Sequence, residues 1–215
     1  MIKIEMHSHT YFSGDGFITP RSIAKQCLKK QLDCVCITDH NSIHGAVEFA
    51  KQVPVKIIIG EEVQTGQGDL IGLFITEKIP PMLGLKITAE KIKEQGGLVY
   101  LPHPFDNFRK SAVKRNDAEK IVQYFDIIEV FNSRTFNPKY NKMAEQFATE
   151  YSICTAVGSD AHHPFEIGNS YMCMDNFEGP QSFLENLRRA TYIAKPCSFL
   201  LRLYIKGLKI LKGKD

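Results

Sequence analysis

Histidines and carboxylates recur in short clusters along this chain. In the first cluster, HSHTYFSGDG, His7 and His9 are one residue apart and Asp15 follows in the same stretch. Later clusters read TDHNS, GEEV, GDL, PHP and GSDAH. Imidazoles and carboxylates packed together without cations would repel one another or lose solvation, and a divalent ion removes both problems. Because a His-x-His pair on a strand directs both rings to the same side, one ion can bind both.

The clusters hold more ligands than one tetrahedral ion needs, so the sequence predicts two or three divalent ions. Mixed nitrogen and oxygen ligands suit Mn, Zn or Fe, whereas Ca would prefer oxygen alone. Each cluster also has an ordinary explanation, such as a turn at Asp15-Gly16 or a solvated strand end at Glu61 or Glu62. Taken together, these ordinary explanations would require every strand end to carry a histidine or a carboxylate by chance, so a metal site is the favoured interpretation. The acidic residues and histidines that lie in or near the ends of strand-like runs are His7, His9, Asp15, Asp39, His40, Glu61, Glu62, Asp69, His103, Glu129, Asp160 and His162.

Strand-like and helix-like segments must position these residues. Seven strand-like runs occur, namely IKIEMH, CVCITDH, VKIIIGEEV, DLIGLFI, LVYLPHP, IIEVFNS and CTAVGSDAH. They mostly alternate with helical segments such as AEKIVQYF and TPRSIAKQCLKKQ, the latter with Thr19 as a predicted N-cap. This alternation predicts an α/β fold with a parallel sheet. In a barrel of parallel strands all carboxyl ends point to one face, where the candidates would converge.

The composition is that of an ordinary globular protein. The chain has 215 residues, of which 43% are hydrophobic, and its net charge is +3. The length and the hydrophobic fraction favour one domain with a substantial hydrophobic core. Residues 195–215 carry six Lys or Arg and one Asp, so the rest of the chain is slightly acidic and duplex nucleic acid is not an expected partner. The six cysteines include no CxxC pair, which favours reduced thiols. The sequence shows no signal peptide and no apolar run of about 18 residues, so we expect a cytoplasmic protein.

The ordered motifs HSHTYFSGDG, ITDHNS, GEEV, LPHP and GSDAH resemble the polymerase-and-histidinol-phosphatase (PHP) family, and within it the stand-alone metal-dependent phosphoesterases. The resemblance covers residues 1–190 and implies a distorted seven-stranded (β/α)7 barrel with a trinuclear site. It implies one metal ion held by His7, His9, Glu62 and Asp160, a second held by Glu62 and His103, and a third held by Asp15, His40 and His162.

One position departs from the family pattern. The family commonly has a histidine where this chain has Asp69. A carboxylate can ligate the same ion, and it would shift the preference towards Mn, Mg or Fe. Asp69 is therefore a further predicted metal ligand.

The function that the resemblance implies is metal-dependent hydrolysis of a phosphomonoester or phosphodiester of a small molecule or nucleotide. Metal ions would generate hydroxide from a bound water, and this hydroxide would attack phosphorus in line with the leaving alkoxide. Arg109 and Arg134, in the loops after the fifth and sixth strands, are predicted to bind the phosphate. The predicted catalytic residues are His7, His9, Asp15, His40, Glu62, His103, Asp160 and His162.

Three alternatives to this function remain open at the level of sequence. Two are enzymes of the same family, a 3′–5′ exonuclease acting on short oligonucleotides and a protein-tyrosine phosphatase. The third is a non-catalytic module stabilised by metal, which has no need of an open multi-metal site. Asp39 is expected to orient His40 or its loop, and His44 and His163 are expected outside the metal shell.

The chain divides into a predicted phosphoesterase domain, residues 1–195, and a basic amphipathic C-terminal helix, residues 196–215. In the tail, Arg202, Lys206 and Lys209 fall on one stripe of a helix that is otherwise strongly apolar. Such a helix is expected to pack on the outside of the barrel or in a homodimer interface, with the basic stripe solvated. The alternative is a helix lying on an anionic membrane surface, which usually has a wider polar face.

Overall fold

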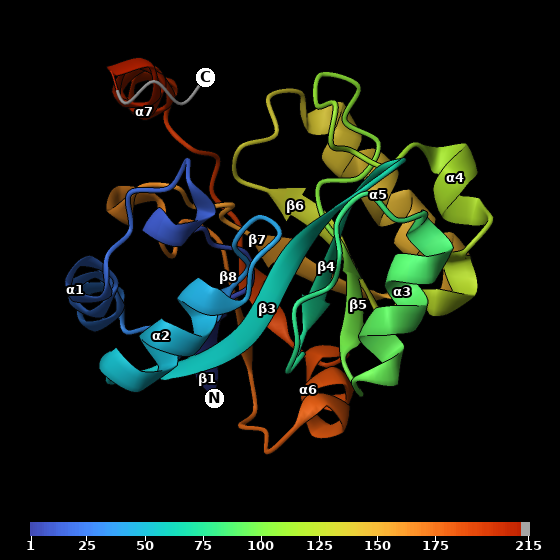
Figure 1. Cartoon of the computed structure of the whole chain (residues 1–215), viewed down its shortest axis with the longest axis horizontal. Helices are drawn as coiled ribbons and strands as arrows, with labels where there is room; N and C mark the ends of the chain where they lie inside the picture. Colours follow the sequence, from blue (N-terminus) through green and yellow to red (C-terminus); the bar gives the residue numbers. More distant parts are fainter. Residues whose placement is uncertain (212–215) are drawn as a thin grey trace.

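One nine-stranded sheet organises the computed structural model, which describes residues 1–211 (Figure 1). A bridge between Ser8 and Ala161 joins the segments that follow the first and seventh strands, so the sheet curls into a nearly closed barrel. In space the strands follow the order β7-β6-β5-β4-β3-β2-β1-β8-β9. They are β1 (Ile2–Glu5), β2 (Cys34–Ile37), β3 (Lys56–Thr65), β4 (Gly68–Leu73), β5 (Leu98–Leu101), β6 (Ile127–Asn132), β7 (Cys154–Gly158), β8 (Tyr171–Met174) and β9 (Thr191–Ile193).

The predicted α/β class is confirmed, but the predicted count of seven strands is wrong, and the sheet is not wholly parallel. β4 runs antiparallel to both β3 and β5, because β3 continues to Thr65 and the chain reverses through a tight turn instead of a helical crossover. Gly68 in this turn has a φ of 125°, which favours glycine. The two additional strands are β8 and β9, with four and three residues, which is too short for a clear period in the sequence.

Helices cover the outer face of the sheet. The helices of the described chain are α1 (Pro20–Lys30), α2 (His44–Gln52), α3 (Leu85–Glu94), α4 (Arg115–Glu119), α5 (Pro138–Tyr151), α6 (Pro180–Leu187) and α7 (Phe199–Leu211), with 3₁₀ turns η1 (Tyr11–Ser13), η2 (Val122–Tyr124) and η3 (Pro164–Glu166), and all but α7 belong to this covering layer. The predicted N-cap is confirmed, since the Thr19 side chain accepts a hydrogen bond from Ser22 N. The predicted helix AEKIVQYF is instead the end of α4 followed by η2, because Ile121 leaves helical geometry with a φ of −128°.

The core consists of two apolar clusters. In β2 all four residues are buried, with Cys34 and Cys36 in the cluster that includes Ile4 and Met6. Val35 and Ile37 belong to the other cluster, beneath α1 and α2. Alternate side chains of a strand point to opposite faces, so a strand covered on both sides is apolar throughout. All six cysteines are free thiols.

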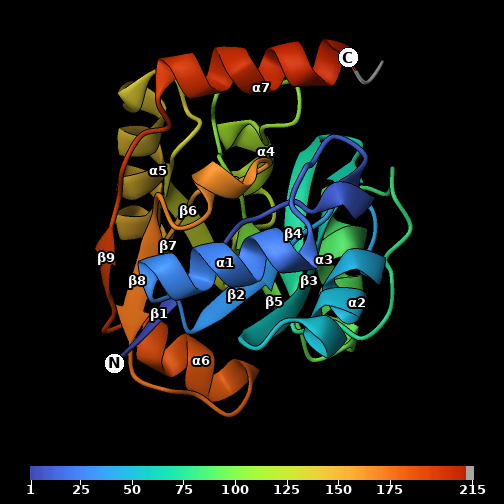
Figure 2. The ribbon, with the colours of Figure 1, turned by 90° about the vertical axis from the view of Figure 1, so that its left-hand side faces the viewer.

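The C-terminal helix α7 runs across one end of the molecule, apart from the helices that cover the sheet (Figure 2). Ile205 is fully buried, whereas Leu200, Leu203 and Tyr204 are exposed. The prediction of a solvated basic stripe is wrong for Arg202, whose guanidinium donates a 2.8 Å hydrogen bond to Ser133 O. The side chain of Lys209 and residues 212–215 of the predicted tail helix lie outside the described residues. Within residues 1–211, no helix is both long and apolar enough to cross a bilayer.

Candidate metal centre

Four side chains from distant parts of the chain direct one ligand atom each to a common point. His7 Nε2 and His9 Nε2 are 3.1 Å apart. Glu62 Oε2 lies 3.6 Å from the first nitrogen and 3.3 Å from the second. Asp160 Oδ1 lies 3.8 Å and 3.4 Å from the same two nitrogens. Tetrahedral ligands about 2.1 Å from an ion are about 3.4 Å apart, and these five distances lie close to that value. His7, His9 and Asp160 form one group whose ligand atoms all lie within 4.8 Å of one another, so they fit one divalent cation, and Glu62 lies beside both histidines.

Local backbone geometry directs two of the predicted ligands. Asp160 follows β7 with a φ of 51°, and His103 follows β5 with a φ of 28°. This left-handed region is uncommon for residues other than glycine and costs free energy, and such residues concentrate at functional sites. Glu62 is different, because it lies within β3 and not at a strand end as the sequence suggested.

The Glu62 carboxylate also joins two further histidines. Its Oε1 lies 2.9 Å from His103 Nε2, and its Oε2 lies 3.0 Å from His40 Nδ1. His7, Glu62 and His103 form one of three groups whose ligand atoms all lie within 4.8 Å of one another. His103 Nδ1 is buried and has no hydrogen-bond partner among the described residues. A carboxylate between imidazoles fits the bridging position that the family resemblance implies.

The third predicted group gathers at the outer side of the cluster. His162 Nε2 lies 2.9 Å from Asp15 Oδ2, and His40 Nε2 lies 3.9 Å from Asp15 Oδ1. The His9 ring lies beside the rings of His40 and His162, with centroid separations of 4.3 Å to each. His9, His40 and His162 form another of the three groups, so the structure places His9 next to the third position as well as the first.

The charges of the cluster suit a cation. Burial and the imidazoles of His162 and His40 lower the pKa of His9 to about 3, so its ring is neutral. Burial opposes a charge on His40, but the Glu62 and Asp15 carboxylates outweigh it and raise that pKa to about 9. Burial likewise opposes ionisation of Asp160, yet the Arg109 guanidinium and His7 hold its pKa well below the usual range. Ionised carboxylates and neutral imidazoles are the forms that bind metal, so Asp160 and His9 are ready to bind an ion, whereas His40 must first lose a proton.

Glu129, in the buried strand β6, supports the ligands from behind. Its Oε1 lies 3.1 Å from His7 Nδ1 and accepts a 3.0 Å hydrogen bond from Tyr100 Oη. Its Oε2 accepts from His103 N at 2.6 Å and from Asn132 Nδ2 at 2.9 Å. Sequence reasoning noticed Glu129 but assigned it no role. The signal was a carboxylate inside the apolar run IIEVF, because a buried charge requires partners.

Asp39 and Asp69 lie near the cluster in different ways. Asp39 accepts hydrogen bonds from Thr10 N at 2.6 Å and Thr10 Oγ1 at 2.7 Å, so it holds the loop that follows β1. Burial and the nearby Glu62 charge raise the pKa of Asp69 to about 7. Asp69 belongs to none of the three ligand groups found among residues 1–211, and it lines a neighbouring cavity of about 520 Å³. Its role as a ligand remains a prediction.

Two histidines lie outside the ligand groups, as expected. His44 is the first residue of α2 and packs edge-on against Phe12. His163 caps η3, where its ring accepts a hydrogen bond from Phe165 N. Neither belongs to a ligand group in the described chain.

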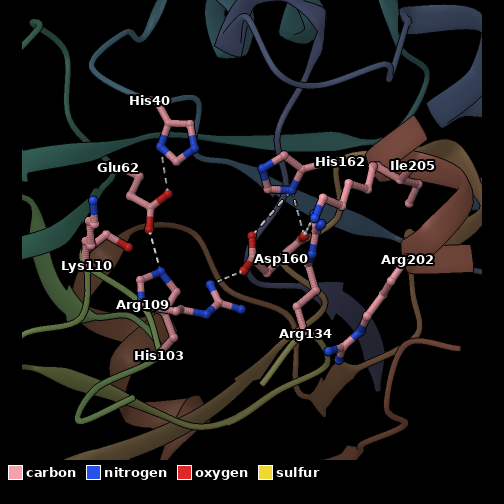
Figure 3. Close-up of a pocket in the computed structure, with 12 residues that line it drawn as sticks. His40, Glu62, His103, Arg109, Lys110, Arg134, Asp160, His162, Arg202 and Ile205 are labelled. Carbon is pink, nitrogen blue, oxygen red and sulfur yellow. Dashed lines mark hydrogen bonds and ion pairs between the residues drawn. The ribbon is translucent and has the colours of Figure 1, made fainter. Parts of the chain in front are cut away.

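A cavity of about 570 Å³ opens above the cluster, and basic side chains line it. Arg109 Nη1 donates a 2.7 Å hydrogen bond to Asp160 Oδ2, and Figure 3 shows its guanidinium directed at that carboxylate. Arg134 Nη1 lies 3.5 Å from Asp160 O. Both predicted phosphate-binding residues therefore lie beside the cluster. The remaining lining residues are His40, Glu62, His103, Lys110, Ser111, His162, Arg202, Ile205 and Lys206.

Comparison with known proteins agrees with this geometry. The family model described as "PHP domain" matches residues 5–171. The "Uncharacterized protein MJ0417" of Methanocaldococcus jannaschii is 37% identical over 219 residues, which cover 100% of this chain and 84% of that protein. A protein of a Thermoanaerobacter species named "Probable phosphatase" is 24% identical over 208 residues, covering 78% of this chain and 82% of its own length.

Two solved structures share the fold. One is a two-domain protein from Bacteroides vulgatus that contains a predicted PHP-like metal-dependent phosphoesterase. It has a TM-score of 0.73 and 19% identity over 90% of this chain, which spans 65% of that structure. The other is PsfC from Pseudomonas syringae, with a TM-score of 0.70 and 15% identity over 97% of this chain and 100% of PsfC. With the match over residues 5–171, the chain belongs to the PHP domain family.

Proposed function

We propose that this protein is a metal-dependent phosphoesterase that hydrolyses a phosphoester of a small molecule or a nucleotide. The observation that carries the proposal is the arrangement of the ligand cluster at one side of a cavity whose other walls are basic. Two or three ions of Mn, Zn or Fe fit the mixed ligands, with Mg as a further candidate. When bound, such ions activate water and neutralise phosphate oxygens.

The chain's own residues then position and stabilise the phosphate. Arg109 lies beside Asp160 with a planar guanidinium that suits two phosphate oxygens. Arg134 lies on the other side of Asp160 and would stabilise charge that develops on the equatorial oxygens. The Glu129 carboxylate accepts a hydrogen bond from a proton on His7 Nδ1, which leaves His7 Nε2 free to act as a ligand.

The size of the cavity favours a small substrate. Its volume of about 570 Å³ falls within the range of small-molecule sites, roughly 300–1,000 Å³. A protein-tyrosine phosphatase or an exonuclease must also accommodate a polymer that continues outside the cavity. We therefore place the small-molecule substrate first. Duplex nucleic acid is not a proposed partner, and a cytoplasmic location is part of the same proposal.

A panel of phosphoesters tests this function. Purified full-length protein, loaded with Mn, Zn or Fe, should release phosphate from at least one sugar phosphate, mononucleotide or phosphodiester, and EDTA should abolish that release. The panel includes short oligonucleotides and a phosphotyrosine peptide. Faster cleavage of either polymer class would replace the small-molecule proposal, and no metal-dependent turnover of any phosphoester would overturn the enzymatic one.

Metal binding should release protons and strengthen as the pH rises. His40, whose pKa is raised to about 9, must lose its proton before it can ligate. For one released proton, the apparent affinity for Mn should increase by about tenfold per pH unit between pH 7 and 9. Isothermal titration calorimetry in buffers of different ionisation enthalpy counts the protons. His40→Gln should release fewer of them, and a wild-type affinity that is independent of pH would contradict this assignment.

A further inference from the structure

The helix α7 forms part of the wall of the cavity above the ligand cluster. Arg202, Ile205 and Lys206 line the cavity together with His162 and Asp160. Figure 3 shows Arg202 and Ile205 projecting from α7 on one side and Lys110 on the opposite side. Because α7 lies beyond the region 5–171 that matches the family model, the family match does not account for this wall.

Two contacts hold α7 in this position. Ile205 is fully buried, although the neighbouring residues Tyr204 and Lys206 are exposed. The Arg202 guanidinium donates to Ser133 O, just past the end of β6. Residues 202 and 206 are four positions apart, so their side chains share one helix face. The contact of Arg202 with the loop after β6 therefore orients Lys206 towards the cavity.

The basic residues of the cavity are not all needed for one phosphate. Arg109 is paired with Asp160 at 2.7 Å, and Arg134 Nε lies 3.8 Å from Glu166 Oε1. Lys206 on α7 and Lys110 on the opposite wall, in contrast, form no ion pair with any residue in the part of the chain that the structure describes, 1–211. The only carboxylates that line the cavity, Glu62 and Asp160, belong to the ligand cluster. Among residues 1–211, no carboxylate pairs with Lys206, and a hydrolysed phosphate beside Asp160 would not pair with it either.

We propose that Lys206 forms a subsite for a second anionic group of the substrate, at the end remote from the phosphate that is hydrolysed. A carboxylate, phosphate or sulfate shares the chemistry that this lysine would recognise. The inference rests on the proposed function, since it assumes that the hydrolysed phosphate lies at the ligand cluster. It identifies the substrate class as compact molecules with two separated anionic groups.

Binding of non-hydrolysable phosphonates tests the subsite without relying on turnover. The probes are alkylphosphonates and matched ω-carboxyalkyl and ω-phosphonoalkyl phosphonates of increasing chain length, titrated into Mn-loaded full-length protein. The wild type should bind one of the probes with anionic groups at both ends about two- to fivefold more tightly than the alkylphosphonate of equal length, as expected for one exposed charge pair. The preferred end group distinguishes carboxylate from phosphate.

Variants of Lys206 test whether this residue causes the preference for probes with a second anionic group. Lys206→Ala should abolish it and leave binding of the plain alkylphosphonate unchanged, Lys206→Glu should reverse it, and Lys206→Arg should retain it. Lys25→Ala, on the exposed surface of α1, is the matched control and should behave as wild type. A wild type without any preference, or a Lys206→Ala variant that keeps it, would overturn the subsite. Failure of every phosphonate to bind would instead count against the proposed phosphoesterase function.

Discussion

Replacing His9 by alanine is expected to reduce metal-dependent phosphoester hydrolysis by about three orders of magnitude. His9 Nε2 lies within 3.4 Å of His7 Nε2, Glu62 Oε2 and Asp160 Oδ1, and the His9 ring contacts the rings of His40 and His162. Its loss removes one ligand from the tightest group and disturbs a second. An ion that contributes several kcal/mol to the transition state accounts for about 10³ in rate. Steady-state kinetics with added Mn and a metal count per chain measure both effects.

The same experiment has a matched histidine control. His44→Ala removes an exposed imidazole from α2 that belongs to no ligand group in the described chain, and it should retain the activity and metal content of the wild type. Circular dichroism should show that both variants keep their secondary structure, because the apolar clusters lie elsewhere. A His9→Ala protein that turns over substrate at the wild-type rate with full metal content would exclude the proposed centre.

Replacing Gly158 by alanine should disrupt the hydrogen bonds through which Glu129 holds the ligand His7 in place. A Cβ on residue 158 would lie 2.1 Å from Glu129 Oε1 and 2.8 Å from His7 Cβ, so one or both must move. Glu129 cannot move without losing its hydrogen bonds to Tyr100 and to the ring of His7. We expect the unfolding free energy to fall by roughly 3 kcal/mol and the Tm by about 10 °C, with at least tenfold weaker metal binding.

Thermal unfolding and metal titration of the Gly158→Ala protein test this prediction, with Gly84→Ala as the control. A Cβ on residue 84 meets no atom within 4 Å, and its φ of −68° is ordinary for alanine. Gly84→Ala should therefore leave the Tm within about 2 °C of the wild type. If Gly158→Ala had an unchanged Tm and metal affinity, the close packing of β1, β6 and β7 around Glu129 would be refuted.

The sequence alone determined which residue types must converge. Imidazoles and carboxylates that follow strand-like runs form a pattern that few structures other than a metal site can accommodate, and His7, His9 and Asp160 do lie together. Alternating strand and helix periods also determined the α/β class, because those periods are local. The strand pattern did not determine whether Glu61 or Glu62 is the metal ligand, because both follow the same apolar run. The prediction of Glu62 came from the family resemblance.

Tertiary structure decided between the two glutamates through the alternation of β3. Glu62 reaches the histidines, while Glu61, its neighbour in the strand, is directed to the other face and accepts a hydrogen bond from Ile79 N. The antiparallel direction of β4 could not be predicted from local sequence either, because a short apolar run has the same pattern in a hairpin strand as in a parallel strand reached by a crossover.

The outer residues of the site depended on tertiary structure most of all. A stripe of Arg202 and Lys206 on a helix is visible in the sequence, but the sequence could not show that the stripe faces the cavity. The partners of Glu129 likewise depended on the bridge between Ser8 and Ala161, which follow β1 and β7, and on the pairing of β7 with β6. Periodicity along the chain indicates which side chains share one face of a helix or strand. What packs against that face depends on contacts between residues far apart in sequence, and no local pattern encodes those contacts.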